Sequence, residues 1–168
     1  MRANSRMDAY LEALARIDPP SHIDLTAPFN RLLKKGLVKQ GRTITFGYFS
    51  KSAANSRPPA LPPSQNDPTG YEHARNRLHV EDFVRRGRER YPLTLLRHSM
   101  ALALVVFERV ATLAPSAKVQ VTVSFDRNVR QGICVFSFHL RRKGQELWPD
   151  IEAFQEACLV IDGTLEQP

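Results

Sequence analysis

The chain has 168 residues, of which 42% are hydrophobic and 24% are charged, and its formal net charge is +7. Such a length and composition are typical of a globular domain with its own core, and they exclude disorder of the whole chain. The longest apolar run, Met100 to Phe107, is too short to span a membrane and the N-terminus lacks an apolar leader. We therefore expect a single domain over residues 1–168 that works in the cytoplasm.

Apolar residues at helical spacing predict a first helix over Met7–Ile17. Thr26 is the expected N-cap of a second helix, which ends before Gly36. The alternation that follows predicts a hairpin of two strands, Leu37–Val38 and Thr43–Phe49.

The middle of the chain begins with a proline-rich loop at about residues 50–70, which holds five of the twelve prolines and is expected to be exposed. Tyr71–Arg90 is polar and rich in arginine, which predicts a surface helix. Leu93–Leu113 is apolar nearly all round, so we expect a helix buried at the centre of the domain. A charge at Leu104 should then prevent folding.

The C-terminal third predicts an antiparallel hairpin, then a short helix that begins at Trp148–Asp150 and a last buried strand. Together the elements predict an α+β fold, with an antiparallel sheet of four to five strands packed with helices and one central buried helix. The expected strands of this sheet are Thr43–Phe49, Val119–Phe125, Ile133–Leu140 and Leu159–Ile161.

The sequence contains no P-loop, dinucleotide-binding glycine motif, nucleophile-elbow serine, zinc-protease motif or paired-cysteine motif. We therefore expect no enzymatic activity, no cofactor and no stoichiometric metal. The densest titratable patch consists of Glu72, His73, His79, Glu81 and Asp82. His79 and Asp82 could ligate a metal, but a solvated helix face is the favoured interpretation of this patch.

Single histidines and cysteines are interpreted as structural. His98 falls within the predicted central helix, where a partly buried structural role is expected. His139 alternates out of phase with Phe138, which places it on the other face of the sheet. Cys134 lies an odd number of residues away, so a nucleophilic pair with His139 is disfavoured. Cys134 and Cys158 are expected to be free, buried thiols.

A nucleic-acid-binding module of the ferredoxin-like type is the alternative function. Its support comes from an arginine cluster that could contact phosphate and from aromatic residues in predicted strands. A core role for these aromatic residues is the favoured interpretation. The residues concerned are Arg85, Arg86, Arg88, Arg90, Phe46, Tyr48, Phe136 and Phe138.

The C-terminal region carries a family resemblance. It has a strand that ends in Phe138-His139, a basic turn, a Gly144-x-Glu146-x-Trp148 step, an acidic stretch and a closing strand at Leu159–Asp162. This text, within Phe136–Glu152 and Leu159–Thr164, resembles the C-terminal part of immunity proteins from bacterial polymorphic-toxin and contact-dependent inhibition systems. The resemblance implies a protein that covers the active site of a cognate toxin domain, such as a nuclease, in a 1:1 heterodimer.

The expected partner surface is the region where the sign of the charge reverses. All 24 Lys and Arg residues precede residue 144, and six of the 17 acidic residues follow Lys143, so residues 1–143 carry +13 and residues 144–168 carry −6. Both signs within one small region suit complementary pairing with a partner, although ordinary solvating charge remains an alternative. Recognition by the proline-rich loop or the arginine-rich region also stays open, as does a core role for the only tryptophan. The predicted partner-binding residues are Arg141, Arg142, Glu146, Trp148, Asp150, Glu152 and Glu156.

Overall fold

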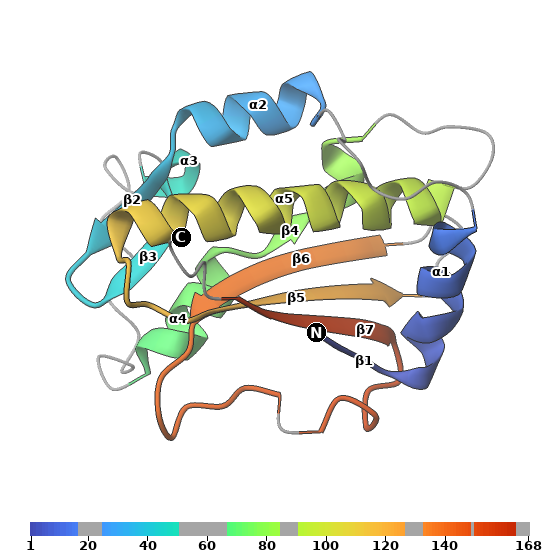
Figure 1. Cartoon of the computed structure of the whole chain (residues 1–168). Helices are drawn as coiled ribbons and strands as arrows, with labels where there is room; N and C mark the ends of the chain where they lie inside the picture. The colour runs from blue at the N-terminus through green and yellow to red at the C-terminus, as the bar shows by residue number, and fades with distance from the viewer. Residues whose placement is uncertain (17–24, 51–66, 85–90, 127–132, 149, 164–168) are drawn as a thin grey trace.

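The computed structural model describes residues 1–16, 25–50, 67–84, 91–126, 133–148 and 150–163. Its main feature is a five-stranded antiparallel sheet with the strand order β1-β7-β5-β6-β4 (Figure 1). The predicted α+β fold is confirmed. The strands are β1 (Arg2–Ala3), β4 (Leu78–His79), β5 (Val119–Asp126), β6 (Ile133–Leu140) and β7 (Ala157–Gly163).

The centre of the sheet is β5, which pairs with β6 on one side and with β7 on the other. Val123 lies opposite Phe136 and Leu159, and all three side chains are buried on the same face. Because β6 and β7 follow one another in sequence but lie on opposite sides of β5, their connection must cross the sheet.

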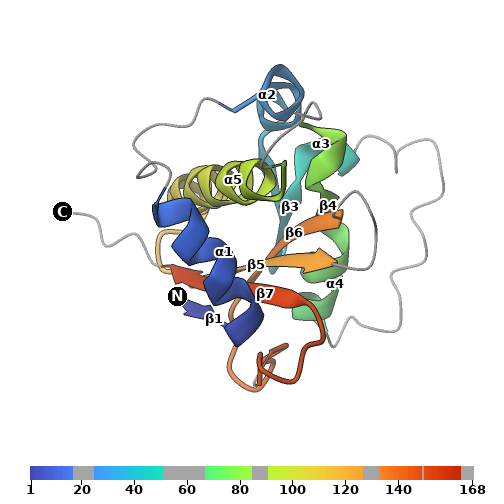
Figure 2. The same cartoon turned by 90° about the vertical axis from the view of Figure 1, so that its right-hand side faces the viewer.

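Helix α5 (Tyr91–Leu113) lies along one face of this sheet (Figure 1). Helix α1 (Ser5–Ala15) packs beside α5 at one end, and α2 (Ala27–Lys34) lies on the outer side of α5 (Figure 2). The core lies between α5 and the sheet, where Leu102, Val106 and Phe136 are fully buried. Leu104, however, is 63% exposed, so the expectation that a charge there prevents folding is wrong.

The sequence predicted that strand β3 (Thr43–Phe46) joins the main sheet, but β3 pairs only with β2 (Leu37–Gln40). Side chains take the place of a neighbouring strand. The Ile44 N–H donates to Glu72 of helix α4 (Pro68–Arg75), and the Phe46 N–H donates to Asn76, the C-cap residue of that helix. The predicted strand is also shorter than expected, because Gly47–Ser50 form helix α3. Gly47 is required there, since a Cβ would collide with the Lys35 carbonyl oxygen.

The surface helix predicted over Tyr71–Arg90 ends early, at Arg75. Asn76 then binds the carbonyl oxygens of Ile44 and Phe138 through its side chain, and β4 begins two residues later. Leu78, Val80 and Val84 are buried, but only Leu78–His79 is a strand, and Val80–Asp82 form a short 3-10 helix. The arginine cluster at 85–90 lies outside the described residues.

The short helix predicted after Trp148 is also absent, because residues 150–156 form turns. The side chain of Asn4 donates to the carbonyl oxygens of Ile151 and Glu156 and so helps to fix these turns. Other boundaries agree with the sequence: Thr26 is the N-cap residue of α2, and Gly36 has the positive φ of 68° expected after a helix. The proline-rich stretch 51–66 and the hairpin tip 127–132 lie outside the described residues.

Candidate functional site

The face of the sheet turned away from α5 is polar. Thr122 on β5 lies between Ser137 on β6 and Val160 on β7, and Gln120 lies between His139 and Asp162. His139, as predicted, is on this face, yet only 1% of its surface is exposed. When a polar sheet face is buried, the residues that cover it must provide hydrogen-bond partners for its polar groups.

Helix α4, through His73, and the connection from β6 to β7 cover this face. We call the connection, residues 141–156, the crossing segment; its Pro149 lies outside the described residues. The segment passes along the lower edge of the sheet in Figure 1. Ile151 is buried in a small apolar cluster with Cys158 and Val160 of β7, and Trp148 and Phe154 pack against that cluster. The crossing segment has no regular secondary structure but has its own small core.

Arg142 anchors the start of the crossing segment in a buried ion pair. Its guanidinium contacts both carboxylate oxygens of Glu72, at 2.7 and 3.0 Å, and Glu72 is fully buried. The same carboxylate accepts hydrogen bonds from the N–H groups of Ile44 and Leu140. Arg142 also donates to the Thr69 hydroxyl. This network joins the hairpin β2–β3, helix α4 and the end of β6 at one point.

Asn4 and Glu152 anchor the end of the crossing segment. Asn4 is fully buried, donates to the carbonyl oxygens of Ile151 and Glu156, and accepts from the N–H groups of Met7 and Cys158. The Glu152 carboxylate accepts from the N–H and the hydroxyl of Ser5 at the N-terminus of α1. A carboxylate is favourable at that position because it offsets the positive end of the helix dipole.

Two histidines and the tryptophan meet between the sheet and its cover. The His73 ring lies 6.0 Å from His139 and 5.3 Å from Trp148, and His73 Nδ1 shares a hydrogen bond with the Ser137 hydroxyl. Burial, followed by the His73 and Arg142 charges, lowers the pKa of His139 to about 4. Burial, followed by Arg77, lowers the pKa of His73 as well. Both rings are therefore neutral near pH 7.

A cavity of about 150 Å³ lies next to this cluster. Thr122, Ser124 and Ser137 line it from the sheet, and Trp148 lines it from the crossing segment. Within the part of the chain that the structure describes, the Thr122 hydroxyl and the Trp148 indole N–H are buried and have no hydrogen-bond partner. Such groups are rare in folded proteins because each costs about 1–3 kcal/mol.

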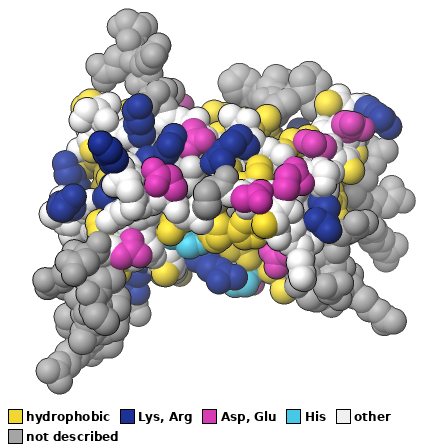
Figure 3. All heavy atoms as spheres, turned by 90° about the horizontal axis from the view of Figure 1, so that it is seen from below, with side chains coloured by type: hydrophobic (Ala, Val, Ile, Leu, Met, Phe, Trp, Pro, Cys, Tyr) yellow, Lys and Arg dark blue, Asp and Glu magenta, His cyan; other side chains and the backbone are white. Residues whose placement is uncertain are grey.

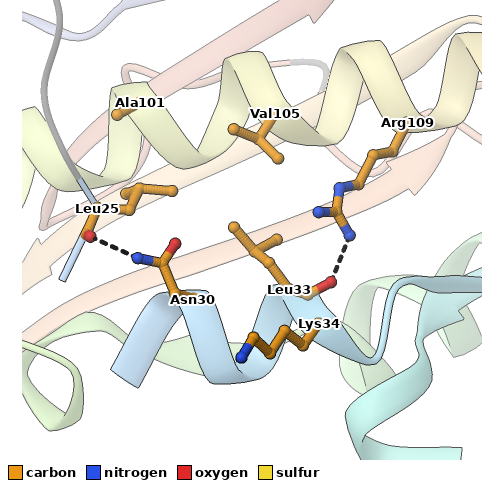
Figure 4. Close-up of a pocket in the computed structure, with 7 residues that line it drawn as sticks. All are labelled: Leu25, Asn30, Leu33, Lys34, Ala101, Val105 and Arg109. Carbon is orange, nitrogen blue, oxygen red and sulfur yellow. Dashed lines mark hydrogen bonds between the residues drawn. The ribbon is translucent and has the colours of Figure 1, made fainter. Parts of the chain in front are cut away.

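A larger groove of about 750 Å³ runs between α2 and α5 (Figure 4). Leu33 and Val105 approach each other across it, and Arg109 donates to the Leu33 carbonyl oxygen. The lining of this groove is about equally polar and apolar, and it includes two cations, Lys34 and Arg109.

The predicted partner-binding residues do come together on the crossing segment, but they differ in role. Arg142 is committed to Glu72, and Glu152 to the start of α1. Trp148 is half-buried, in agreement with a packing role that leaves part of its surface accessible. The exposed ones are Arg141, Glu146, Asp150, Glu152 and Glu156.

The acidic residues of this surface are visible from below, where Figure 3 shows acidic side chains across the middle of the face with basic ones beside them. Arg141 is 3.5 Å from the Asp162 carboxylate, so its charge is partly balanced by the sheet. Glu146 and Asp150 lie on the outer side of the segment, where a partner can reach them.

Sequence reasoning missed Glu72 and Asn76 as structural residues. Thr69, Glu72 and Asn76 repeat at a spacing of three and four residues and are all fully buried, so α4 presents a polar stripe to the interior. A polar stripe at helical spacing usually marks a solvated face, and only its partners in the fold identify it as buried.

The titratable patch of the predicted long helix does not form one face, because that helix does not exist. His79 pairs instead with Glu81 at 3.1 Å. Among the described residues, no group of three or more His, Cys, Asp or Glu side chains is placed to hold a metal ion. His98 is nearly buried and packs against Phe29, which confirms its structural role.

The remaining single-residue expectations concern the cysteines and the strand aromatics. Cys134 and Cys158 are free and buried, and burial raises the pKa of the Cys134 thiol to about 12. Phe46, Phe136 and Phe138 are fully buried, so their core role is confirmed and they offer no face on which bases could stack. The expectation is wrong for Tyr48, which lies in α3 and is 50% exposed. Within the described ranges, no helix is long and apolar enough to cross a membrane.

No curated protein and no solved structure matches the chain. A family model described as "Uncharacterized protein PM0498 family" matches residues 2–166, a range that includes both anchors of the crossing segment and the whole five-stranded sheet. The chain belongs to the PM0498 family.

Proposed function

We propose that this chain is a binding protein that recognises a bacterial toxin domain through the crossing segment and neutralises it by covering its active site. It acts by 1:1 association in the cytoplasm, without turnover and without a cofactor. The alternative is a nucleic-acid-binding module; of the aromatic residues named for it, Phe46, Phe136 and Phe138 are buried and only Tyr48 is exposed.

The observation that carries the proposal is the anchoring of the crossing segment. Long connections without regular structure are uncommon in compact domains and are usually functional. This one is held at its start by Arg142, at its end by Asn4 and in its middle by Ile151. Since its conformation is fixed before binding, little ordering entropy is lost when a partner docks, and affinity rises accordingly.

The composition of the segment also suits a protein interface. A half-buried tryptophan, Trp148, is flanked by exposed Glu146 and Asp150. Aromatic residues are enriched at the centres of interfaces, and charged residues at the rim set orientation and association rate. An acidic surface of this kind is complementary to the basic cleft of a nuclease, which is the toxin class that the sequence resemblance suggested.

A growth assay tests the proposal. The open reading frames next to this one in its genome are searched for a toxin, and its C-terminal domain is expressed in cells with and without the intact chain. We expect growth arrest with the toxin domain alone and recovery with the chain. Continued arrest, with both proteins produced in soluble form, would contradict the proposal.

A salt titration distinguishes the proposed toxin-binding function from the alternative of nucleic-acid binding. Generic RNA and DNA duplexes labelled with a fluorophore are mixed with the chain at low and physiological salt. The proposal predicts weak binding that disappears as salt rises. About micromolar or tighter binding at physiological salt, with an affinity that falls steeply as salt is raised further, favours the alternative, because phosphate contacts release counterions.

A further inference from the structure

We propose that the cavity between the crossing segment and the polar sheet face is a binding site for a single carboxylate group. The site goes beyond the recognition surface described above, because it lies on the inner side of the crossing segment and is tested without any protein partner.

Unused hydrogen-bond donors are the first reason. Thr122 is only 7% exposed, and its hydroxyl has no hydrogen-bond partner in the described part of the chain. The Trp148 indole N–H, also without a partner there, can only donate. Arg77 lines the same cavity and carries five N–H donors. A lining with donors left over fits a ligand that only accepts, and an ionised carboxylate is such a group.

The charges of the lining favour a monoanion over a dianion. Arg77 contributes one positive charge and Glu156 one negative charge, so the lining is neutral overall. His73 also lines the cavity, but its lowered pKa keeps it neutral near pH 7. Glu156 repels any anion, and it repels a phosphate dianion more strongly than a carboxylate, whose single charge Arg77 can balance.

The size of the cavity limits what surrounds the carboxylate. A volume of about 150 Å³ corresponds to the share of roughly five water molecules in the liquid, at ~30 Å³ each. A carboxylate with one to three carbon atoms fits this space. The group can belong to a free small acid or to the acidic side chain of a peptide, and the chemistry of recognition is the same in both cases.

The fluorescence of Trp148 reports occupancy directly, because it is the only tryptophan of the chain. The full chain is titrated with sodium acetate, and sodium chloride keeps the ionic strength constant. We expect a saturable change in emission. The amide resonances of Thr122 and Ser124 in a nitrogen-15 spectrum should shift over the same concentration range, which identifies the cavity as the site.

Three variants assign the contacts. Thr122→Val removes the hydroxyl without changing the volume, and Arg77→Gln removes the cation. Each should weaken acetate binding about tenfold or more, since a hydrogen bond to a charged group contributes about 1.5–3 kcal/mol. Thr122→Ser keeps the hydroxyl and should retain binding. Arg31→Gln, an exposed arginine on α2, is the matched control and should bind as the unchanged chain does.

Further probes distinguish the source and the chemistry of the ligand. Binding of N-acetyl-aspartate amide as well as acetate indicates a site that accepts a peptide side chain, whereas binding of acetate alone indicates a free acid. Both outcomes support a carboxylate site. Tighter binding of inorganic phosphate than of acetate, or equal binding of acetate by the Thr122→Val and Arg77→Gln variants, would overturn it, and so would no saturable change in either measurement.

Discussion

Glu72 shows at the scale of one residue how the crossing segment is fixed. Its buried carboxylate receives two backbone N–H groups and both terminal nitrogens of Arg142. A buried charge is tolerated only when it is paired and its lone pairs are used. Glu72 meets this condition, and removing its charge would leave the Arg142 guanidinium without a counter-ion.

Glu72→Gln should therefore lower the free energy of unfolding by about 3–5 kcal/mol, the usual cost of breaking one half of a buried pair. Urea denaturation measures the change. The matched control is Glu12→Gln, which removes an exposed helical pair with Arg16 at 3.7 Å and should change stability by less than about 1 kcal/mol. Equal effects of the two substitutions would contradict the structural role of Glu72.

His139 gives a prediction for the dependence on pH. Its pKa is about 4 in the folded chain, against roughly 6.5 when unfolded. Between these values only the unfolded state takes up a proton, so stability is complete above about pH 6.5 and falls as the pH drops towards 4. The loss from this group should be about 2 kcal/mol between roughly pH 7.5 and 5.

Urea denaturation at the two pH values, with the intact chain and with His139→Gln, tests this expectation. The variant should lose less stability on acidification than the intact chain, by about the same 2 kcal/mol. An equal loss in both chains would show that His139 titrates in the folded state as it does in the unfolded one.

The sequence predicted some of these residues and not others. Alternation along β6 was enough to place His139 on the face opposite Phe138, because a strand has a strict period of two. Its burial was not predictable, since the cover comes from a later part of the chain. Glu72 was taken as a solvated charge for the same reason: its partner, Arg142, is far away in sequence.

At the scale of elements, the start of α1 and the end of the crossing segment are one unit joined by Asn4. The Asn4 side chain caps α1 through the Met7 N–H, and it binds the Cys158 N–H and two carbonyl groups. The pairing of β1 with β7 and the Ser5–Glu152 contact join the same backbones. The Asn4 amide adds the buried link among β1, α1 and the crossing segment.

Asn4→Ala should lower the melting temperature markedly and speed hydrogen exchange of the Cys158 amide, because several buried partners are left unsatisfied at about 1–3 kcal/mol each. Asn30→Ala is the control, since Asn30 is exposed and donates only to the Leu25 carbonyl oxygen. Its effect should stay within about 0.5 kcal/mol. Unchanged exchange at Cys158 in Asn4→Ala would refute the coupling.

Helix α5 contains two leucines, two residues apart, whose surroundings differ. Leu102 is fully buried, whereas Leu104 is 63% exposed. Leu102→Asp should prevent folding because it buries an unpaired charge, and Leu104→Asp should fold with a stability change of about 0.5 kcal/mol or less. Circular dichroism and thermal melting of the pair measure this. Unfolding of Leu104→Asp would mean that the outer face of α5 is covered.

Element prediction succeeded where the pattern was long and local. The α5 helix and the β5–β6 hairpin were predicted because their periodicity is carried by adjacent residues. A short helix after Trp148 was predicted because Ile151 and Phe154 have helical spacing, but these residues form turns to which the Asn4 side chain is hydrogen-bonded. Distant side chains decided the outcome, and no local pattern shows them.

For the whole molecule, the fold places its net charge in two regions of opposite sign. Among the described residues, the acidic side chains after Lys143 lie on the crossing segment and β7, and most of the basic side chains lie on the helices, on the hairpin β2–β3 and at the start of the crossing segment. A rigid acidic surface on a basic body can orient an approaching partner before contact. The proposed recognition of a toxin domain depends on this surface.

The choice of residues for testing that surface follows from their contacts. Reversing the charge of Glu152 would disturb the start of α1, so the substitution of Glu152 and Glu156 suggested by the sequence would confuse stability with binding. Glu146 and Glu156 have exposed side chains and serve better. The matched control reverses Glu12 and Glu108, which are exposed on α1 and α5.

The most direct test is calorimetric titration of the toxin domain encoded beside this chain into the intact chain, into Glu146→Lys with Glu156→Lys, and into the Glu12→Lys with Glu108→Lys control. The double reversal on the crossing segment should weaken binding at least about a hundredfold, because each stranded interfacial charge costs about 2–5 kcal/mol. The control should bind as the intact chain does. Equal affinities for all three would contradict the assignment of the crossing segment as the recognition surface.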